Sequence, residues 1–234
     1  MDYIYRLRTR IGEEGIRNTI RYIGHVGFYS LNDYLLDTYL DYKYSGRMLH
    51  GNHKTHFKNL GSNDTYHTSY SAMPLIFKFI QIKPDDVLVD VGCGKGRVIN
   101  YWLNMECKND IIGLELDPDI AERTARQFTK WSNVKIIQGD AVANLPDNGT
   151  LFYFYNPFSE NIVRLFERKV AAISENRPVN IIYYNPKSVH IFDNGNWDIK
   201  QINFERDLGV KRWGRLNKYH DLALISKKAG TPLA

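Results

Sequence analysis

Short apolar runs alternate with amphipathic segments along most of the chain, and this alternation restricts the folds available to it. The apolar runs have the length of buried strands and cover residues 87–92, 111–116, 134–140, 151–156 and 180–185. The segments between them have helical spacing and cover residues 75–80, 98–103, 120–131 and 161–174. Because strands joined by crossover helices run parallel, the pattern predicts a Rossmann-like, doubly wound α/β fold with a mostly parallel sheet.

The C-terminal part of the chain departs from this alternation. Residues 199–206 and 220–227 have the pattern of two further strands, joined by a basic loop without helical spacing. We expect an antiparallel hairpin at the sheet edge, which brings the sheet to seven strands. Residues 200–228 hold eight Lys or Arg and three acids (8 − 3 = +5), which equals the net charge of the whole chain. The basic loop, residues 211–218, is either a solvated surface or a contact for phosphate or an acidic acceptor.

The N-terminal residues differ from the rest, because ten of the sixteen tyrosines lie in residues 1–70. Spacing predicts helices over residues 13–23 and 31–44. We therefore divide the chain into an N-terminal helical, Tyr-rich cap or substrate-recognition extension, residues 1–62, and a core domain, residues 63–234.

Residues 50–64 join the two parts and have the composition of a linker. His50, His53 and His56 lie three residues apart in it, but no cysteine or acid at useful spacing supplies a fourth ligand. We interpret the segment as a polar loop and expect no metal site.

Composition excludes several classes of protein. Hydrophobic residues make up 43% of the chain and aromatic residues 13%, too many for a disordered chain. No run approaches the roughly 20 apolar residues of a membrane span. We expect no signal peptide, because the first residues, MDYIYRLRTRIGEEG, lack its apolar segment. The two cysteines, Cys93 and Cys107, argue against a disulfide scaffold and for the cytoplasm.

A glycine-rich turn, in VLVDVGCGKGRV (87–98), follows the first predicted strand. Glycines at 92, 94 and 96 let a ligand approach the backbone, as in α/β folds that bind nucleotide-like ligands. A dinucleotide fingerprint needs its third glycine where Arg97 stands, and Asp90 repels a pyrophosphate but suits a cationic amino group. The turn therefore argues against a nicotinamide cofactor. Asp90 has a second interpretation as a helix cap, and we expect Lys95 and Arg97 to face solvent.

The stretch VLVDVGCGKGR resembles the first motif of class I S-adenosylmethionine-dependent methyltransferases, in a small bacterial type with YNPF after the fourth strand. The resemblance covers roughly residues 63–228 and implies S-adenosylmethionine as cofactor, with S-adenosylhomocysteine as product. It implies that Glu115 binds the ribose hydroxyls, that Asp140 binds the adenine amino group, and that Ala141 packs beside the base. The cofactor-binding residues that we expect are Tyr66, Ser69, Asp90, Gly92, Gly94, Gly96, Glu115, Asp140, Ala141 and Asn156.

Two segments of this pattern have competing interpretations. In one interpretation, a hydroxyl or ring from Tyr66, Thr68, Ser69 or Tyr70 faces the methionine end of the cofactor; in the other, Ser69 or Ser71 caps the next helix. Asn156, Pro157 and Phe158 stand at the methyl-transfer position, which makes them the expected catalytic residues. We expect Pro157 to hold Asn156 extended, and the alternative for Asn156 is a bond within its own loop.

We therefore expect a methyltransferase, and we favour a nitrogen nucleophile on a protein or small molecule as acceptor. The alternatives are a non-catalytic sensor or structural subunit that binds the cofactor, and a nucleic-acid or sugar methyltransferase. Nucleic acid is the less favoured partner, because no nucleic-acid motif accompanies the basic loop. A sugar oxygen needs a general base, for which His190 and His220 are the candidates.

Overall fold

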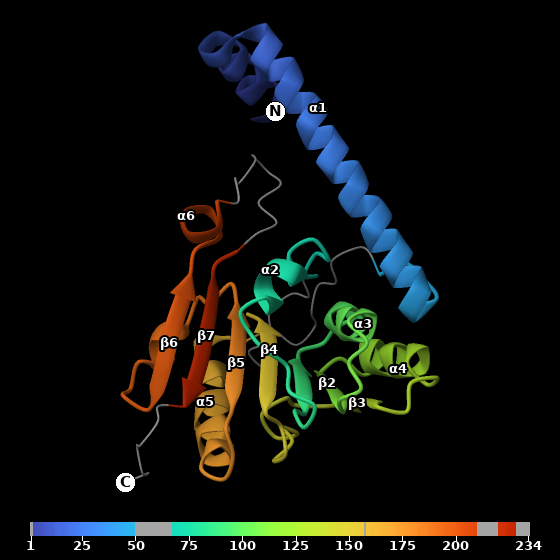
Figure 1. Cartoon of the computed structure of the whole chain (residues 1–234), viewed down its shortest axis with the longest axis vertical. Coiled ribbons are helices and arrows are strands. Elements are labelled where there is room, and N and C mark those ends of the chain that lie inside the picture. The colour runs from blue at the N-terminus through green and yellow to red at the C-terminus, as the bar shows by residue number, and fades with distance from the viewer. Residues whose placement is uncertain (1, 50–66, 157, 210–219, 228–234) are drawn as a thin grey trace.

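The computed structural model describes residues 2–49, 67–156, 158–209 and 220–227 (Figure 1). The linker histidines, the basic loop of residues 211–218, Tyr66 and Pro157 lie outside these residues, so the predictions made for them stay predictions.

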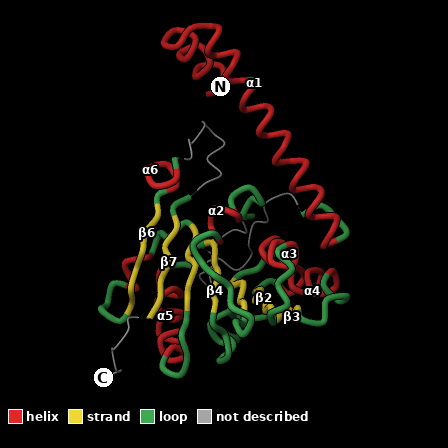
Figure 2. The backbone as a smooth tube through the Cα atoms, viewed as in Figure 1, coloured by secondary structure: helices red, strands yellow, loops and turns green. Residues whose placement is uncertain are grey.

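A seven-stranded sheet forms the centre of the molecule (Figures 1 and 2). Its strands stand in the order β3-β2-β1-β4-β5-β7-β6. The first five along the chain pair in parallel, and β7 runs antiparallel to both β5 and β6. The predicted sheet with an antiparallel edge hairpin is therefore confirmed. The strands are β1 (Leu88–Val91), β2 (Ile111–Glu115), β3 (Val134–Gln138), β4 (Leu151–Tyr155), β5 (Asn180–Tyr184), β6 (Trp197–Ile202) and β7 (Leu222–Lys227).

The four helices predicted between residues 75 and 174 are present, and two short helical segments after residue 188 were not predicted. They are α2 (Met73–Phe77), α3 (Arg97–Asn104), α4 (Pro118–Gln127), α5 (Glu160–Ser174), the short 3-10 turn η2 (Val189–Phe192) and α6 (Phe204–Leu208). The expectation of a strand through residue 206 is wrong, because β6 ends at Ile202 and α6 follows at once. The Asn203 side chain accepts a hydrogen bond from the backbone N–H of Arg206 and so caps α6.

Helices cover both faces of the sheet (Figure 1). On one face, α2 and α3 bury Phe77, Ile99 and Trp102 against β1 and β4. On the other face, α5 buries Val163, Phe166, Val170 and Ile173. Side chains alternate along β4 between the two faces, so Tyr153 joins the first core while Phe152 and Phe154 join the second.

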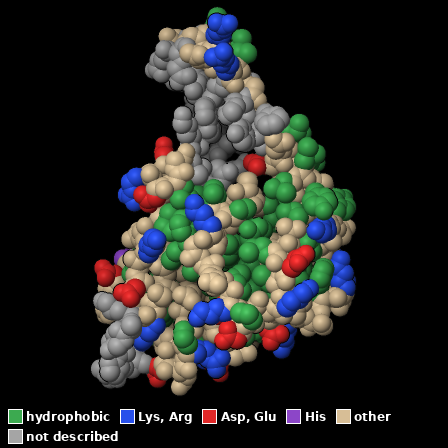
Figure 3. Space-filling model, viewed as in Figure 1, with side chains coloured by type: hydrophobic (Ala, Val, Ile, Leu, Met, Phe, Trp, Pro, Cys, Tyr) green, Lys and Arg blue, Asp and Glu red, His purple; other side chains and the backbone are tan. Residues whose placement is uncertain are grey.

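The N-terminal helix α1 (Asp2–Ser45) runs 44 residues and projects from the sheet domain (Figure 1). Two separate helices were expected here, but the structure joins them, with the kink at Gly15 (φ 79°). Among its described side chains, Leu40 and Tyr44 near the C-terminal end join the core. Apolar side chains gather on its exposed surface (Figure 3), and they include Leu31, Tyr34, Leu35, Leu36, Tyr39 and Tyr42. None of the described helices combines the length and apolar character that a membrane crossing requires.

Candidate cofactor-binding site

The three glycines of the turn after β1 are all left-handed. Gly92, Gly94 and Gly96 have φ of 75°, 53° and 83°, a region that side chains disfavour. A Cβ on Gly96 would lie 2.6 Å from the Phe128 ring. The turn therefore needs glycine for its own geometry, and of the three glycines Gly92 is exposed.

Side chains from β2 and α4 hold this turn. The Glu115 carboxylate accepts hydrogen bonds from the backbone N–H of Gly94 and of Asp117, each at 2.9 Å. Thr124 donates its hydroxyl hydrogen to the Gly94 carbonyl at 2.8 Å. Gln127 donates to the Lys95 carbonyl at 2.7 Å. Both backbone polar groups of Gly94 are thus satisfied by side chains, which fixes the turn.

Glu115 ends β2 beside the turn, as the sequence predicts, and is only 8% exposed. Burial raises its pKa, against the effect of the backbone N–H bonds that favour its charged form. Ribose binding by Glu115 remains a prediction. The hydrogen bonds that Glu115 and Thr124 make with Gly94 could not be predicted from the sequence, because no local pattern links residues 21 or 30 positions apart.

Asp90 is 2% exposed, and its Oδ2 atom has no hydrogen-bond partner among the described residues. Burial, and secondly the charge of Glu115, raise the pKa of Asp90 well above its usual range. The helix-cap interpretation is not supported, because Gly96 is the N-cap of α3 and no side chain caps it. A buried carboxylate without a partner is costly and is ready to bind a hydrogen-bond donor.

A small pocket opens at Asp90. Its wall is formed by His67, Thr68, Asp90, Gly92, Cys93, Arg97, Val98, Tyr153 and Tyr155. The structure thus brings together two of the predicted site residues with Thr68, whose hydroxyl hydrogen-bonds that of Tyr153. Burial raises the pKa of the Cys93 thiol well above its usual range, so Cys93 is not an activated nucleophile. The sequence analysis missed Tyr153 and Tyr155, although alternation along β4 puts both on one face.

Ser69 does not line this pocket. Its hydroxyl lies 3.1 Å from that of Ser71, and α2 begins after Ala72 with no side-chain cap. The helix-cap interpretation of Ser69 is therefore wrong, and its role as a cofactor ligand stays a prediction.

Asp140 and Ala141 follow β3, next to the end of β2. The exposed Asp140 accepts a hydrogen bond from the Ala143 backbone N–H at 2.8 Å, as a turn residue does. Ala141 is buried in the second core. The Gly139 N–H bonds to the Glu115 carbonyl at 2.9 Å, which keeps both strand ends together. Adenine binding at this edge stays a prediction.

Asn156 follows β4 in an unexpected conformation. Its φ is 41°, so the expectation of an extended residue before Pro157 is wrong. Asparagine accepts left-handed geometry better than most residues, and its Oδ1 atom accepts a 2.9 Å hydrogen bond from the Tyr183 hydroxyl. Asn156 is not part of the pocket wall, and Phe158 packs partly buried against the second core.

The two candidate bases lie in different places. His190 is exposed beside Glu160, 3.3 Å away. The ring of His220 lies 5.4 Å from that of Tyr155 and 5.5 Å from that of Tyr184. Only His220 therefore neighbours a residue of the pocket wall. Among the described residues, no group of three or more His, Cys, Asp or Glu is arranged to hold a metal ion.

The segment that contains this turn is similar to known proteins. Residues 89–155 match the family model described as a methyltransferase domain. The ribosomal RNA small subunit methyltransferase A of Pseudomonas syringae pv. tomato is 34% identical over 67 residues, which is 29% of this chain and 24% of that protein. The chain thus spans about a quarter of the length of this curated relative.

Solved structures share the fold at low identity. An RNA methyltransferase from Salinibacter ruber, solved with S-adenosyl-L-homocysteine, has a TM-score of 0.50 at 15% identity, covering 72% of this chain and 98% of that one. A chain of the complex between the Haloferax volcanii Trm112 methyltransferase activator and a methyltransferase has a TM-score of 0.52 at 11% identity, covering 70% and 91%.

The residues present fit the cofactor of that family. The unpaired Asp90 oxygen could accept a hydrogen bond from an ammonium group, and Gly92 of the turn is exposed on the pocket wall beside it. The matched segment contains both Asp90 and the glycine turn. Residues 89–155 are therefore similar to a methyltransferase domain, and the described sheet shares its fold with a solved methyltransferase structure.

Proposed function

We propose that the protein transfers a methyl group from S-adenosylmethionine to a nitrogen nucleophile on a protein or small molecule. The observation that carries the proposal is the unpaired carboxylate oxygen of Asp90, buried in a pocket beside the glycine turn within the matched segment. A buried acid without a partner is a feature of a binding site, since it lowers stability and needs a ligand to offset that cost.

The residues that would hold the cofactor lie along the carboxyl ends of the parallel strands. Asp90 would accept from the ammonium group, Glu115 from the ribose hydroxyls, and Asp140 from the adenine amino group. Strand register supports this order, because Asp90 pairs with Gly113 of β2, and Glu115 pairs with Gln138 of β3. Ligands of open α/β sheets bind at this edge.

The bound cofactor supplies an already activated methyl group, so the protein's task is mainly to orient the acceptor. Tyr155 reaches the pocket wall from β4 and packs 4.9 Å from the ring of Tyr184, with His220 against both. We propose that this aromatic group flanks the acceptor and that Asn156, the next residue after β4, accepts a hydrogen bond from its amino group.

Binding and transfer test the proposal in sequence. Calorimetry with S-adenosylhomocysteine should give saturable binding, whereas absence of binding by the folded protein would reject it. Methyl-labelled cofactor is then offered with cell extract, and we expect label in a protease-sensitive or small-molecule fraction. Binding without label in any fraction would favour the non-catalytic sensor.

RNA is a second candidate acceptor. It is supported by the likeness of residues in the matched segment to a ribosomal RNA methyltransferase, so the expectation that nucleic acid is a poor partner has no support. Label that ribonuclease releases, with binding that weakens steeply as salt rises, would select RNA over a protein or small amine.

A further inference from the structure

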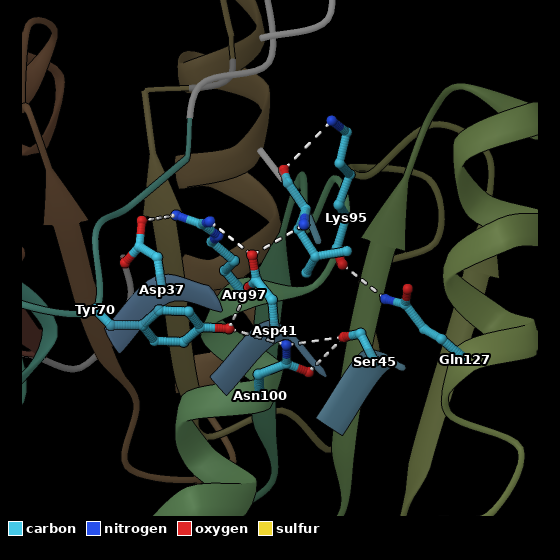
Figure 4. Close-up of polar contacts among 9 residues, drawn as sticks. Asp37, Asp41, Ser45, Tyr70, Lys95, Arg97, Asn100 and Gln127 are labelled. Carbon is cyan, nitrogen blue, oxygen red and sulfur yellow. Dashed lines mark hydrogen bonds and ion pairs between the residues drawn. The ribbon is translucent and has the colours of Figure 1, made fainter. Parts of the chain in front are cut away.

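Arg97, which the sequence analysis expected at the surface, is instead buried between α1 and α3. It is 5% exposed and is the first residue of α3, directly after the glycine turn. Its two terminal nitrogens donate to Asp37 and Asp41 of α1, each at 2.7 Å (Figure 4). The N-terminal helix thus supplies both partners of a cation that stands at the cofactor turn.

The surrounding polar groups fix the position of Asp41. It is fully buried and also accepts hydrogen bonds from the Tyr70 hydroxyl and from the Leu49 backbone N–H, each at 2.9 Å. Asn100 of α3 donates to Ser45 and to the Tyr70 hydroxyl. Figure 4 shows α1 and α3 joined through this continuous set of bonds. A buried network of this kind holds its members rigidly.

One donor of Arg97 is left over. Its Nε atom is buried and has no hydrogen-bond partner among the described residues, although Arg97 forms part of the pocket wall. Asp90 is on the same wall, with an acceptor oxygen that is also without a partner. Two residues of the pocket wall thus carry unsatisfied atoms, an acceptor on Asp90 and a donor on Arg97, and each costs stability until it is paired.

The two groups suit the two ends of an amino-acid zwitterion. An ammonium group can donate to Asp90, and a carboxylate can accept a charge-assisted hydrogen bond from the guanidinium. We propose that Arg97 binds the carboxylate of the cofactor's amino-acid end through Nε, and that Asp37 and Asp41 are positioning residues that hold it there. The proposal rests on the proposed function, and it makes α1 a working part of the cofactor site.

Access to these atoms requires a local movement. Neither atom is open to bulk solvent, and the wall consists of β1, β4, the start of α3 and the segment at His67 and Thr68. Since the sheet and α3 are fixed by the core, the proposal requires the segment at His67 and Thr68 to move when a ligand reaches both groups.

The test compares two ligands that differ only in the carboxylate. S-adenosylhomocysteine carries it, and its decarboxylated analogue, S-adenosyl-3-thiopropylamine, keeps the ammonium group alone. In calorimetry, Arg97→Gln should weaken binding of the first by about 10- to 100-fold and leave binding of the second within about twofold. Asp37→Asn should weaken only the first, by several-fold, because Arg97 is then held less firmly.

Controls separate this role from a structural one. Arg126→Gln, on the exposed surface of α4, should change neither affinity. Arg97→Gln leaves two acids without a cation, which can prevent folding. If the single variant does not fold, the triple variant with Asp37→Asn and Asp41→Asn, which removes all three charges, takes its place in the comparison. Equal loss of both ligands, or loss of neither, would overturn the proposal while the proposed function stands. Failure of the wild-type protein to bind either ligand would reject both.

Discussion

The Glu115 carboxylate accepts a hydrogen bond from the Gly94 backbone N–H at 2.9 Å, so the end of β2 holds the turn that follows β1. Two strands that are neighbours in the sheet are thereby tied at the edge where the cofactor is expected to bind. A residue assigned to ribose binding thus has a second task in the protein itself.

Replacement of this carboxylate should affect both tasks. Glu115→Ala removes two backbone hydrogen bonds and the expected ribose contact. We expect S-adenosylhomocysteine to bind about 30- to 150-fold more weakly, by calorimetry, and the melting temperature to fall by several degrees. Asp117→Ala is the matched control, since the Asp117 side chain caps α4, and it should lower stability alone. Unchanged affinity in folded Glu115→Ala would remove Glu115 from the site.

Replacement of Asp90 should raise the stability of the protein at neutral pH but weaken its binding of the cofactor. The pKa of Asp90 is raised in the folded protein, above the value of about 3.9 in an unfolded chain. The folded state then holds the proton more tightly, so its contribution to stability is full below pH ~4 and is lost as the pH rises through the folded pKa.

Asp90→Asn removes the carboxyl group and with it the loss of stability that occurs as the pH rises. The variant should melt a few degrees higher than the wild type at neutral pH, with the difference vanishing in acid, and it should lose cofactor affinity. Thermal melts from pH 4 to 8, with and without S-adenosylhomocysteine, measure both effects. A variant that is less stable at neutral pH, or that binds the cofactor normally, would contradict the assignment.

The glycine turn should not tolerate a side chain. Gly94 has φ of 53°, so Gly94→Val strains the backbone and places a branched side chain in the ligand's approach. We expect no thermal shift with S-adenosylhomocysteine. Gly195→Val is matched for backbone strain, with φ of 87° and open space around its Cβ position, and it should keep the full shift. A full shift in Gly94→Val would show that the turn is not the binding loop.

The fold could be predicted from the sequence because each strand and helix carries its own local pattern. The glycine turn, Asp90 and Glu115 could be located for the same reason, as they follow directly from strand ends. Burial of Arg97 could not be predicted, since its partners lie 60 and 56 residues away on another helix. The available signal was the spacing of Asp37, Asp41 and Ser45, which puts polar groups on one face of α1.

The backbone conformation predicted from local sequence was also wrong at a residue that makes a contact distant in sequence. A residue before proline favours extended backbone, but the bond from Tyr183 accompanies a left-handed Asn156. The same sequence, Tyr-Asn-Pro, follows β5, where Asn185 has φ of 55°. In the parallel pairing of β4 with β5, Tyr155 lies opposite Tyr184. The two turns that follow these residues therefore lie side by side at the carboxyl ends of the strands.

This duplication supplies the control for the role of Asn156. If Asn156 orients the acceptor, Asn156→Ala should leave S-adenosylhomocysteine affinity within about threefold and lower turnover by roughly 100-fold. Asn185→Ala has comparable backbone strain and should keep its rate. Tyr183→Phe removes the hydrogen bond to Asn156 while keeping the amide, so it should cost stability but little turnover. Cofactor binding, melting and methyl transfer are measured on the same preparations with an acceptor from the labelling experiment. If Asn156→Ala loses stability as Tyr183→Phe does and keeps its rate per folded molecule, Asn156 only holds its loop.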